Sequence, residues 1–125
     1  MTQDIYAAEA KERWGDTDAY KESQRRMAGY SKEDIAKAQQ AMQDATNLVL
    51  IAMKAGLPAD SPEAMAGAEA HRQSISDYWY ECSYEIHTGL ATMYLADPRF
   101  MAHYESQQAG LAKYIHDAIV ANANK

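Results

Sequence analysis

The chain has 125 residues and a mass of 13.9 kDa, the usual size of one domain and too short for two. Hydrophobic residues make up 47% and charged residues 24%, whereas glycine and proline are few, so a disordered, collagen-like or loop-rich all-β chain is excluded. The net charge is −6 and no basic cluster is present, so we expect no nucleic-acid binding by this chain. A single compact all-α domain is the predicted fold class.

Cellular location can be judged from apolar runs and cysteine usage. The longest apolar run, residues 48–53, is far too short to cross a bilayer, and the first residues lack the layout of a signal peptide. The single cysteine, Cys82, excludes an internal disulfide and an all-cysteine metal site. We therefore expect a cytoplasmic protein without membrane association.

The first thirty residues differ from the rest because charged side chains outnumber large apolar ones. Gly15 and Asp16 interrupt the helical pattern, which predicts two short helices, and isolated helices of that length are marginal in water. We predict that residues 1–30 form a mobile flap unless something binds against them. Residues 31–125 are then the helical core of one domain.

A long helix is predicted to follow Ser31. Ser31 and Asp34 resemble a capping box in which Asp replaces the usual Glu. Gly56, as a left-handed C-cap, and Pro58 should end this helix. Its apolar stripe, at steps of three and four residues, consists of Ile35, Ala38, Met42, Ala45, Val49, Ala52 and Met53.

Further helices begin at recognisable N-caps. Ser61 before Pro62 opens one, Ser83 opens another, and Asp97 before a proline restarts the chain again. No period-two alternation occurs, so no strand is predicted. The expected apolar faces are Ala64, Met65, Ala68, His71, Ile75, Tyr78 and Trp79, then Ile86, Leu90, Met93 and Tyr94, and finally Leu111, Tyr114, Ile115, Ala118 and Ile119.

Four aromatic side chains stand within seven residues at a predicted helix junction, between Tyr78 and Tyr84. Such rings are good anchors for a bulky amphipathic ligand, although each also fits an ordinary core position. If Tyr78, Trp79 and Cys82 share a helical turn, the thiol lies beside the rings. Its acidic neighbours oppose activation by a helix N-terminus, and a buried inert cysteine is the alternative.

Catalytic and metal-binding patterns are missing. No two of the four histidines stand four residues apart, no Glu-x-x-His pair occurs, and no nucleophile elbow or phosphate loop is present. We therefore predict no enzyme activity, no metal and no cofactor. A haem or metal protein of globin type remains an alternative, whereas His71 and His87 fit equally well as polar residues lining a cleft.

The chain resembles the TipAS antibiotic-recognition domain family over roughly residues 9–123. The stretch Arg-Trp-Gly-Asp-Thr-Asp-Ala-Tyr is the most specific part of the resemblance. The matching segments are Glu12–Tyr20, Ser31–Asp34, Ala55–Ser61, His71–Arg72, Tyr80–Leu90, Met93–Asp97, Arg99–Phe100 and Asp117–Ile119.

This resemblance implies an all-helical, globin-like domain without haem that captures thiopeptides or other bulky macrocyclic or aromatic-rich antibiotics. In the family, a loosely ordered amino-terminal segment folds over the ligand, and the domain acts as the sensing half of MerR-type activators or as a free-standing drug-binding protein. The DNA-binding helices of such activators have no counterpart here, so we expect a sequestering protein or an isolated sensor domain. A helical protein-interaction domain is the remaining alternative.

The expected ligand-binding residues combine the resemblance with the aromatic junction. They are Trp14 and Tyr20 on the flap, Tyr78, Trp79, Cys82, Tyr84 and His87 along the cleft, and Arg72 as a polar contact. Thiopeptide-binding relatives carry a second cysteine where this chain has Gly89. Seven residues of helix span about 10.5 Å, so Cys82 does not replace that thiol and covalent capture is not expected.

Overall fold

The computed structural model describes residues 18–125, and it is all-helical there, as predicted, with no strand in that range. Trp14 and the first predicted short helix lie outside the described residues. None of the described helices is long and apolar enough to cross a membrane. The helices are α2 (Asp18–Met27), α3 (Lys32–Lys54), α4 (Pro62–Tyr78), α5 (Tyr84–Ala96), α6 (Pro98–Glu105) and α7 (Leu111–Ala123).

The predicted capping box opens α3. The Ser31 hydroxyl accepts a hydrogen bond from the Asp34 backbone N–H at 3.2 Å, and the Asp34 carboxylate accepts one from the Ser31 N–H at 3.0 Å. After Lys54 the chain leaves the helix through Gly56, whose φ of 77° lies in the left-handed region. Both ends of the longest helix are therefore set by local sequence.

The other predicted caps are also confirmed. The side chains of Ser61, Ser83 and Asp97 accept hydrogen bonds from backbone N–H groups in the first turns of α4, α5 and α6. The start of α7 differs, because Gly110 has a φ of 87° and makes no side-chain cap. There the Glu105 carboxylate accepts from two backbone N–H groups, those of Gly110 and Ala112, each at 3.0 Å.

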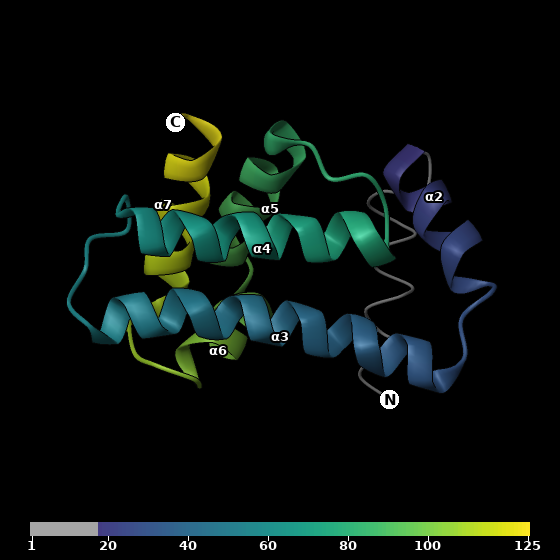
Figure 1. Ribbon diagram of the computed structural model, residues 1–125, viewed down its shortest axis with the longest axis horizontal. Helices are drawn as coiled ribbons and strands as arrows, with labels where there is room; N and C mark the ends of the chain where they lie inside the picture. Colours follow the sequence, from purple (N-terminus) through teal and green to yellow (C-terminus); the bar gives the residue numbers. More distant parts are fainter. Residues whose placement is uncertain (1–17) are drawn as a thin grey trace.

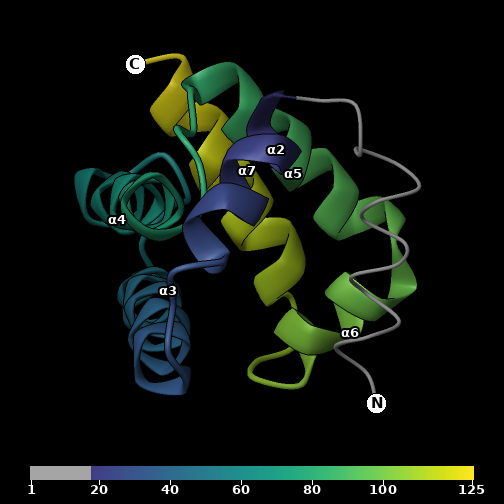
Figure 2. The ribbon, with the colours of Figure 1, turned by 90° about the vertical axis from the view of Figure 1, so that its right-hand side faces the viewer.

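The helices form two layers with α7 between them. Helices α3 and α4 run side by side in one layer, and α5 and α6 lie on the opposite side of α7 (Figures 1 and 2). Gly67 lets α3 and α4 approach closely, because a Cβ there would lie 2.7 Å from Val49 Cγ2 and 2.9 Å from the Val49 nitrogen. Helices α3 and α4 can therefore pack closely at Gly67.

The core lies where α3, α4 and α7 meet α5 and α6. Its buried members are Val49, Ala52, Ala64, Ala68, Ala91, Tyr94, Tyr104, Leu111, Ala112, Ile115, Ala118 and Ile119.

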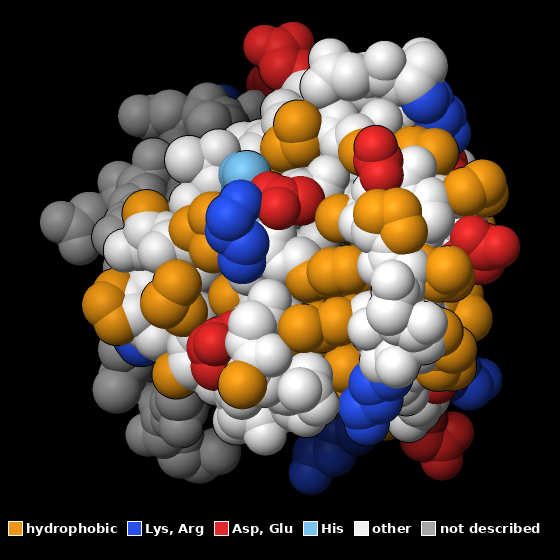
Figure 3. Space-filling view, turned by 90° about the vertical axis from the view of Figure 1, so that its left-hand side faces the viewer, with side chains coloured by type: hydrophobic (Ala, Val, Ile, Leu, Met, Phe, Trp, Pro, Cys, Tyr) orange, Lys and Arg blue, Asp and Glu red, His pale blue; other side chains and the backbone are white. Residues whose placement is uncertain are grey.

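One predicted apolar face is wrong in part. Ile86 is 37% exposed, whereas His87, Ala91 and Tyr94 are the buried residues of α5, because that helix turns its histidine face towards α4. The end of the molecule that carries the α3–α4 connection shows apolar side chains between scattered charged groups (Figure 3).

Candidate functional site

The aromatic junction is a turn and not a continuous helix. Helix α4 ends at Tyr78, and the chain reaches α5 only at Tyr84. Ser76 Oγ accepts a hydrogen bond from the Cys82 backbone N–H at 2.9 Å, which folds the connection back on α4. Tyr78, Trp79 and Cys82 therefore do not share a helical turn, the arrangement that the sequence left open.

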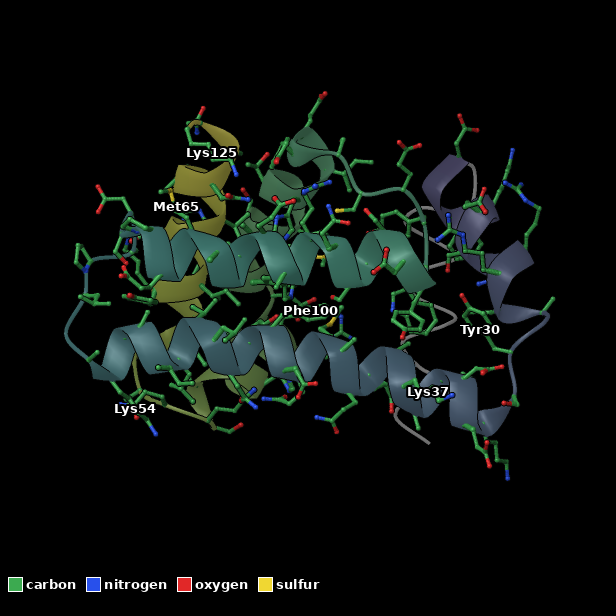
Figure 4. The ribbon with its side chains drawn as sticks, in the orientation of Figure 1. Tyr30, Lys37, Lys54, Met65, Phe100 and Lys125 are labelled. Carbon is green, nitrogen blue, oxygen red and sulfur yellow. The ribbon has the colours of Figure 1, made fainter. Side chains whose placement is uncertain are left out.

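Helix α2 and the residues after it dock on the carboxyl-terminal end of α4, the end near the label of Tyr30 in Figure 4. Arg26 donates to the Ser76 carbonyl at 2.6 Å, and the Tyr30 hydroxyl donates to the Tyr78 carbonyl at 2.5 Å. These last-turn carbonyls have no partner inside the helix, and a cation is favourable there. The Tyr30 ring also meets the half-buried Trp79 edge to face, with 6.3 Å between centroids.

Arg72 ties α4 to the junction and to α7. Its guanidinium pairs with the Glu69 carboxylate at 2.5 and 3.1 Å and donates to the Cys82 carbonyl at 2.7 Å. The same guanidinium lies 4.4 Å from the centre of the Tyr84 ring. Glu69 also accepts from Asn122 of α7 at 3.0 Å, and its pKa is held well below the usual range, chiefly by Arg72. Arg72 therefore positions Tyr84 and holds the connection in place.

Cys82 is fully buried at the base of this junction. Burial raises the pKa of its thiol to about 11, so it stays protonated at neutral pH. The structure therefore supports the inert alternative for this cysteine.

His71 and His87 form a buried pair between α4 and α5. His71 Nδ1 lies 2.9 Å from His87 Nε2, the rings stack with 5.1 Å between centroids, and both side chains are 0% exposed. Burial lowers the pKa of His71 to about 4. Burial, with His71 and Arg72 nearby, lowers that of His87 to about 3. Both histidines are therefore neutral core residues, and neither lines an open cleft.

The outer nitrogens of this pair, His71 Nε2 and His87 Nδ1, have no hydrogen-bond partner within the described part of the chain. Across residues 18–125 no group of three or more His, Cys, Asp or Glu side chains is placed to hold a metal ion.

Residues 18–125 line at least two surface hollows. The α5–α7 hollow has a volume of about 510 Å³ and is lined by Tyr84, Glu85, Thr88, Gly89, Thr92, Val120, Ala123 and Asn124. The α3–α6 hollow has a volume of about 570 Å³ and is lined by Ala36, Gln39, Gln40, Met42, Gln43, Thr46, His103 and Tyr104.

The structure does not bring the sequence-predicted site residues together in one hollow. Tyr84 lines the α5–α7 hollow, and Gly89 opens it, since nothing lies within 4 Å of where its Cβ would be. Tyr20, Tyr78 and Trp79 lie half-buried on α2 and at the end of α4, and Trp14 lies outside the described residues. The α3–α6 hollow was missed entirely, although uncharged glutamines along α3 were a possible signal.

Comparison with known proteins relates this chain to a protein family by both sequence and structure. A family model described as the TipAS antibiotic-recognition domain matches residues 6–122. The chain belongs to this family. The chain is 47% identical over 120 residues to the HTH-type transcriptional activator TipA of Streptomyces coelicolor and 30% identical over 118 residues to the HTH-type transcriptional activator mta of Bacillus subtilis.

These alignments cover 96% and 94% of the TipAS domain but 47% and 45% of the relatives, so the chain spans about half their length. A solved structure of TipAS from Streptomyces lividans in complex with nosiheptide is 46% identical, with a TM-score of 0.88, covering 97% of this chain and 85% of that one. The antibiotic-binding domain of a TipA-class multidrug resistance regulator is 45% identical, with a TM-score of 0.64, covering 70% and 93%.

Proposed function

We propose that this chain binds thiopeptides or other bulky macrocyclic or aromatic-rich antibiotics without transforming them chemically. The observation that carries the proposal is the match in fold and sequence to the nosiheptide-bound TipAS structure, with a TM-score of 0.88 and 46% identity. The protonated state of the buried Cys82 thiol and the lack of a thiol at position 89 favour reversible, non-covalent binding.

In this proposal the predicted site residues divide by exposure. Trp14, Tyr20, Tyr78, Trp79 and Tyr84 contact the ligand, because large flat rings give much contact area at a low cost in side-chain entropy. The other three predicted residues support the site without contacting the ligand. Arg72 already donates to Glu69 and to the junction, and Cys82 and His87 are fully buried. In the same proposal, residues 1–30 are the flap and residues 31–125 the ligand-binding core of one domain.

The proposed biological role rests on the kind of protein in which related domains occur. Because relatives are HTH-type transcriptional activators, we propose a cytoplasmic ligand sensor for such an activator or, if the chain acts alone, a protein that sequesters the drug. Both roles need binding without catalysis.

A titration with nosiheptide tests this function. We expect saturable binding with a change in tryptophan fluorescence, and unfolding that requires about 2.7 kcal/mol more at a hundredfold excess over Kd. Mass spectrometry of the mixture should return protein and ligand at unchanged masses. Trp79→Ala should reduce the fluorescence response, whereas Leu48→Ala, a change at an exposed residue of α3 outside both hollows, should leave it intact.

Absence of any thermal shift with nosiheptide and other thiopeptides would refute the proposed function. A covalent adduct on Cys82 would refute its non-covalent part and leave recognition standing.

A further inference from the structure

The α3–α6 hollow is the one of the two that reaches the core. Its floor includes Thr46 and Tyr104, which are 2% and 3% exposed, whereas every residue lining the α5–α7 hollow is half-buried or exposed. The Tyr104 ring also packs against that of Tyr94 in the core, with 5.1 Å between ring centroids and an angle of 58° between the ring planes. A guest in the α3–α6 hollow would therefore contact side chains that the core already holds in place.

The side chains that line this hollow are apolar or polar, with one histidine, His103. No Lys, Arg, Asp or Glu is among its eight residues, although such residues make up 24% of the chain. A charged ligand would lose hydration here without gaining an ion pair, which is costly. The hollow therefore favours an uncharged guest.

Three glutamines of α3 supply the polar groups. The Gln43 amide donates to Asn47 at 2.9 Å and to Gln107 at 2.8 Å, and the Gln40 amide donates to Asp44 at 2.7 Å. These bonds use both N–H groups of Gln43 and one of the two of Gln40, and they leave the carbonyl oxygens of both side chains as oriented acceptors. Gln39 makes no side-chain hydrogen bond within residues 18–125, so it can both donate and accept.

This pattern complements a ligand that itself carries amides. Peptide N–H groups suit the two oriented carbonyls, a peptide carbonyl suits the Gln39 amide, and flat rings suit the Met42 and Tyr104 side chains beneath. The volume of about 570 Å³ is that of a drug-sized site, so it holds a portion of a bulky macrocycle.

We propose that the α3–α6 hollow binds the uncharged, amide-bearing part of the antibiotic, with Gln39, Gln40 and Gln43 as the residues that determine this preference. The inference rests on the proposed function and specifies its site. It places the deepest ligand contacts between α3 and α6, away from Tyr84 and Gly89.

Calorimetric titration of the full chain with nosiheptide, an amide-rich macrocycle, tests the site. Gln39→Leu removes one amide and should raise Kd about five- to tenfold, the usual effect of a lost hydrogen bond. Ala36→Phe fills the hollow from an exposed position of α3 and should raise Kd at least about tenfold. The matched controls are Gln73→Leu, an exposed glutamine of α4 outside both hollows, and Thr92→Phe, which fills the α5–α7 hollow.

The outcomes separate the site from the function. Loss with Gln39→Leu and Ala36→Phe but not with Gln73→Leu, together with a smaller loss or none with Thr92→Phe, supports the inference. Unchanged binding by both hollow variants, or loss with Thr92→Phe alone, overturns it and leaves antibiotic recognition intact. Failure of the unmodified chain to bind refutes the proposed function. Since all four substitutions are at exposed positions, circular dichroism should show helical content equal to that of the unmodified chain.

Discussion

Acid should destabilise this fold through the buried pair His71 and His87. Their pKa values in the folded chain, about 4 and 3, lie below the ordinary value of 6.5. The unfolded chain therefore takes up protons at a higher pH than the folded chain. The free energy of unfolding is then fully retained above about pH 6.5 and declines as the pH falls towards the folded-state values.

The size of this effect follows from the two shifts. Between about pH 7.5 and pH 5, each histidine removes about 2 kcal/mol from the free energy of unfolding, so the pair removes about 4 kcal/mol. That is a large part of the 5–15 kcal/mol typical of a domain. Carboxylates contribute little in this window because their ordinary pKa values lie near 4.

Urea unfolding, followed by circular dichroism at about pH 7.5, 6.5, 5.5 and 5, measures the effect. A double variant, His71→Met with His87→Leu, removes both buried imidazoles and their unpartnered nitrogens and should flatten the pH dependence. His103→Gln, at an exposed position, is the matched control and should keep the steep profile. Equal slopes for the unmodified chain and the double variant would refute this reasoning.

Further substitutions and one chemical probe test other parts of the structure. Gly67→Ala should lower the free energy of unfolding by about 1–3 kcal/mol, because the new Cβ would clash with Val49. Gly89→Ala, where the new Cβ would stand in open space, should raise the free energy of unfolding by about 0.5–1 kcal/mol. Chemical denaturation of both variants checks these opposite signs. Cys82 should react with a disulfide reagent at about pH 8 far more slowly in the folded chain than in urea, and equal rates would contradict its burial. Arg72→Ala should lower the free energy of unfolding by about 2 kcal/mol, because the charged hydrogen bonds of the guanidinium are lost. An unchanged melting temperature would show that the junction is stable without these bonds.

Local sequence predicted the helix boundaries well. The caps at Ser31, Ser61, Ser83 and Asp97 are hydrogen bonds between residues at most three positions apart. The residue types alone are therefore enough to predict them. The all-helical class followed from the same spacing. The turn at Gly110 was less visible, because its support comes from Glu105, five residues earlier in the chain.

The candidate site was less predictable because it depends on distant segments. The pairing of His71 with His87 joins two helices across the junction, and no spacing rule specifies it. The sequence predicted a helix junction here, but it left open whether Cys82 shares a helical turn with Tyr78 and Trp79. The hydrogen bond from the Cys82 N–H to Ser76 Oγ turns the chain, so it does not. The glutamines of α3 were unremarkable as a sequence, and they form a site only because Tyr104 of α6 lies beneath them.

The close contact at Gly67 has a consequence for how this protein could change its preferences. Because Val49 of α3 lies directly against Gly67 of α4, there is no free space between the two helices at this point. The helix that carries the three glutamines therefore cannot slide or tilt without displacing α4. A new ligand specificity should therefore arise from substitutions of side chains on a helix whose position stays fixed. Libraries of variants confined to the exposed positions of α3 should be enough to change which antibiotics the protein binds.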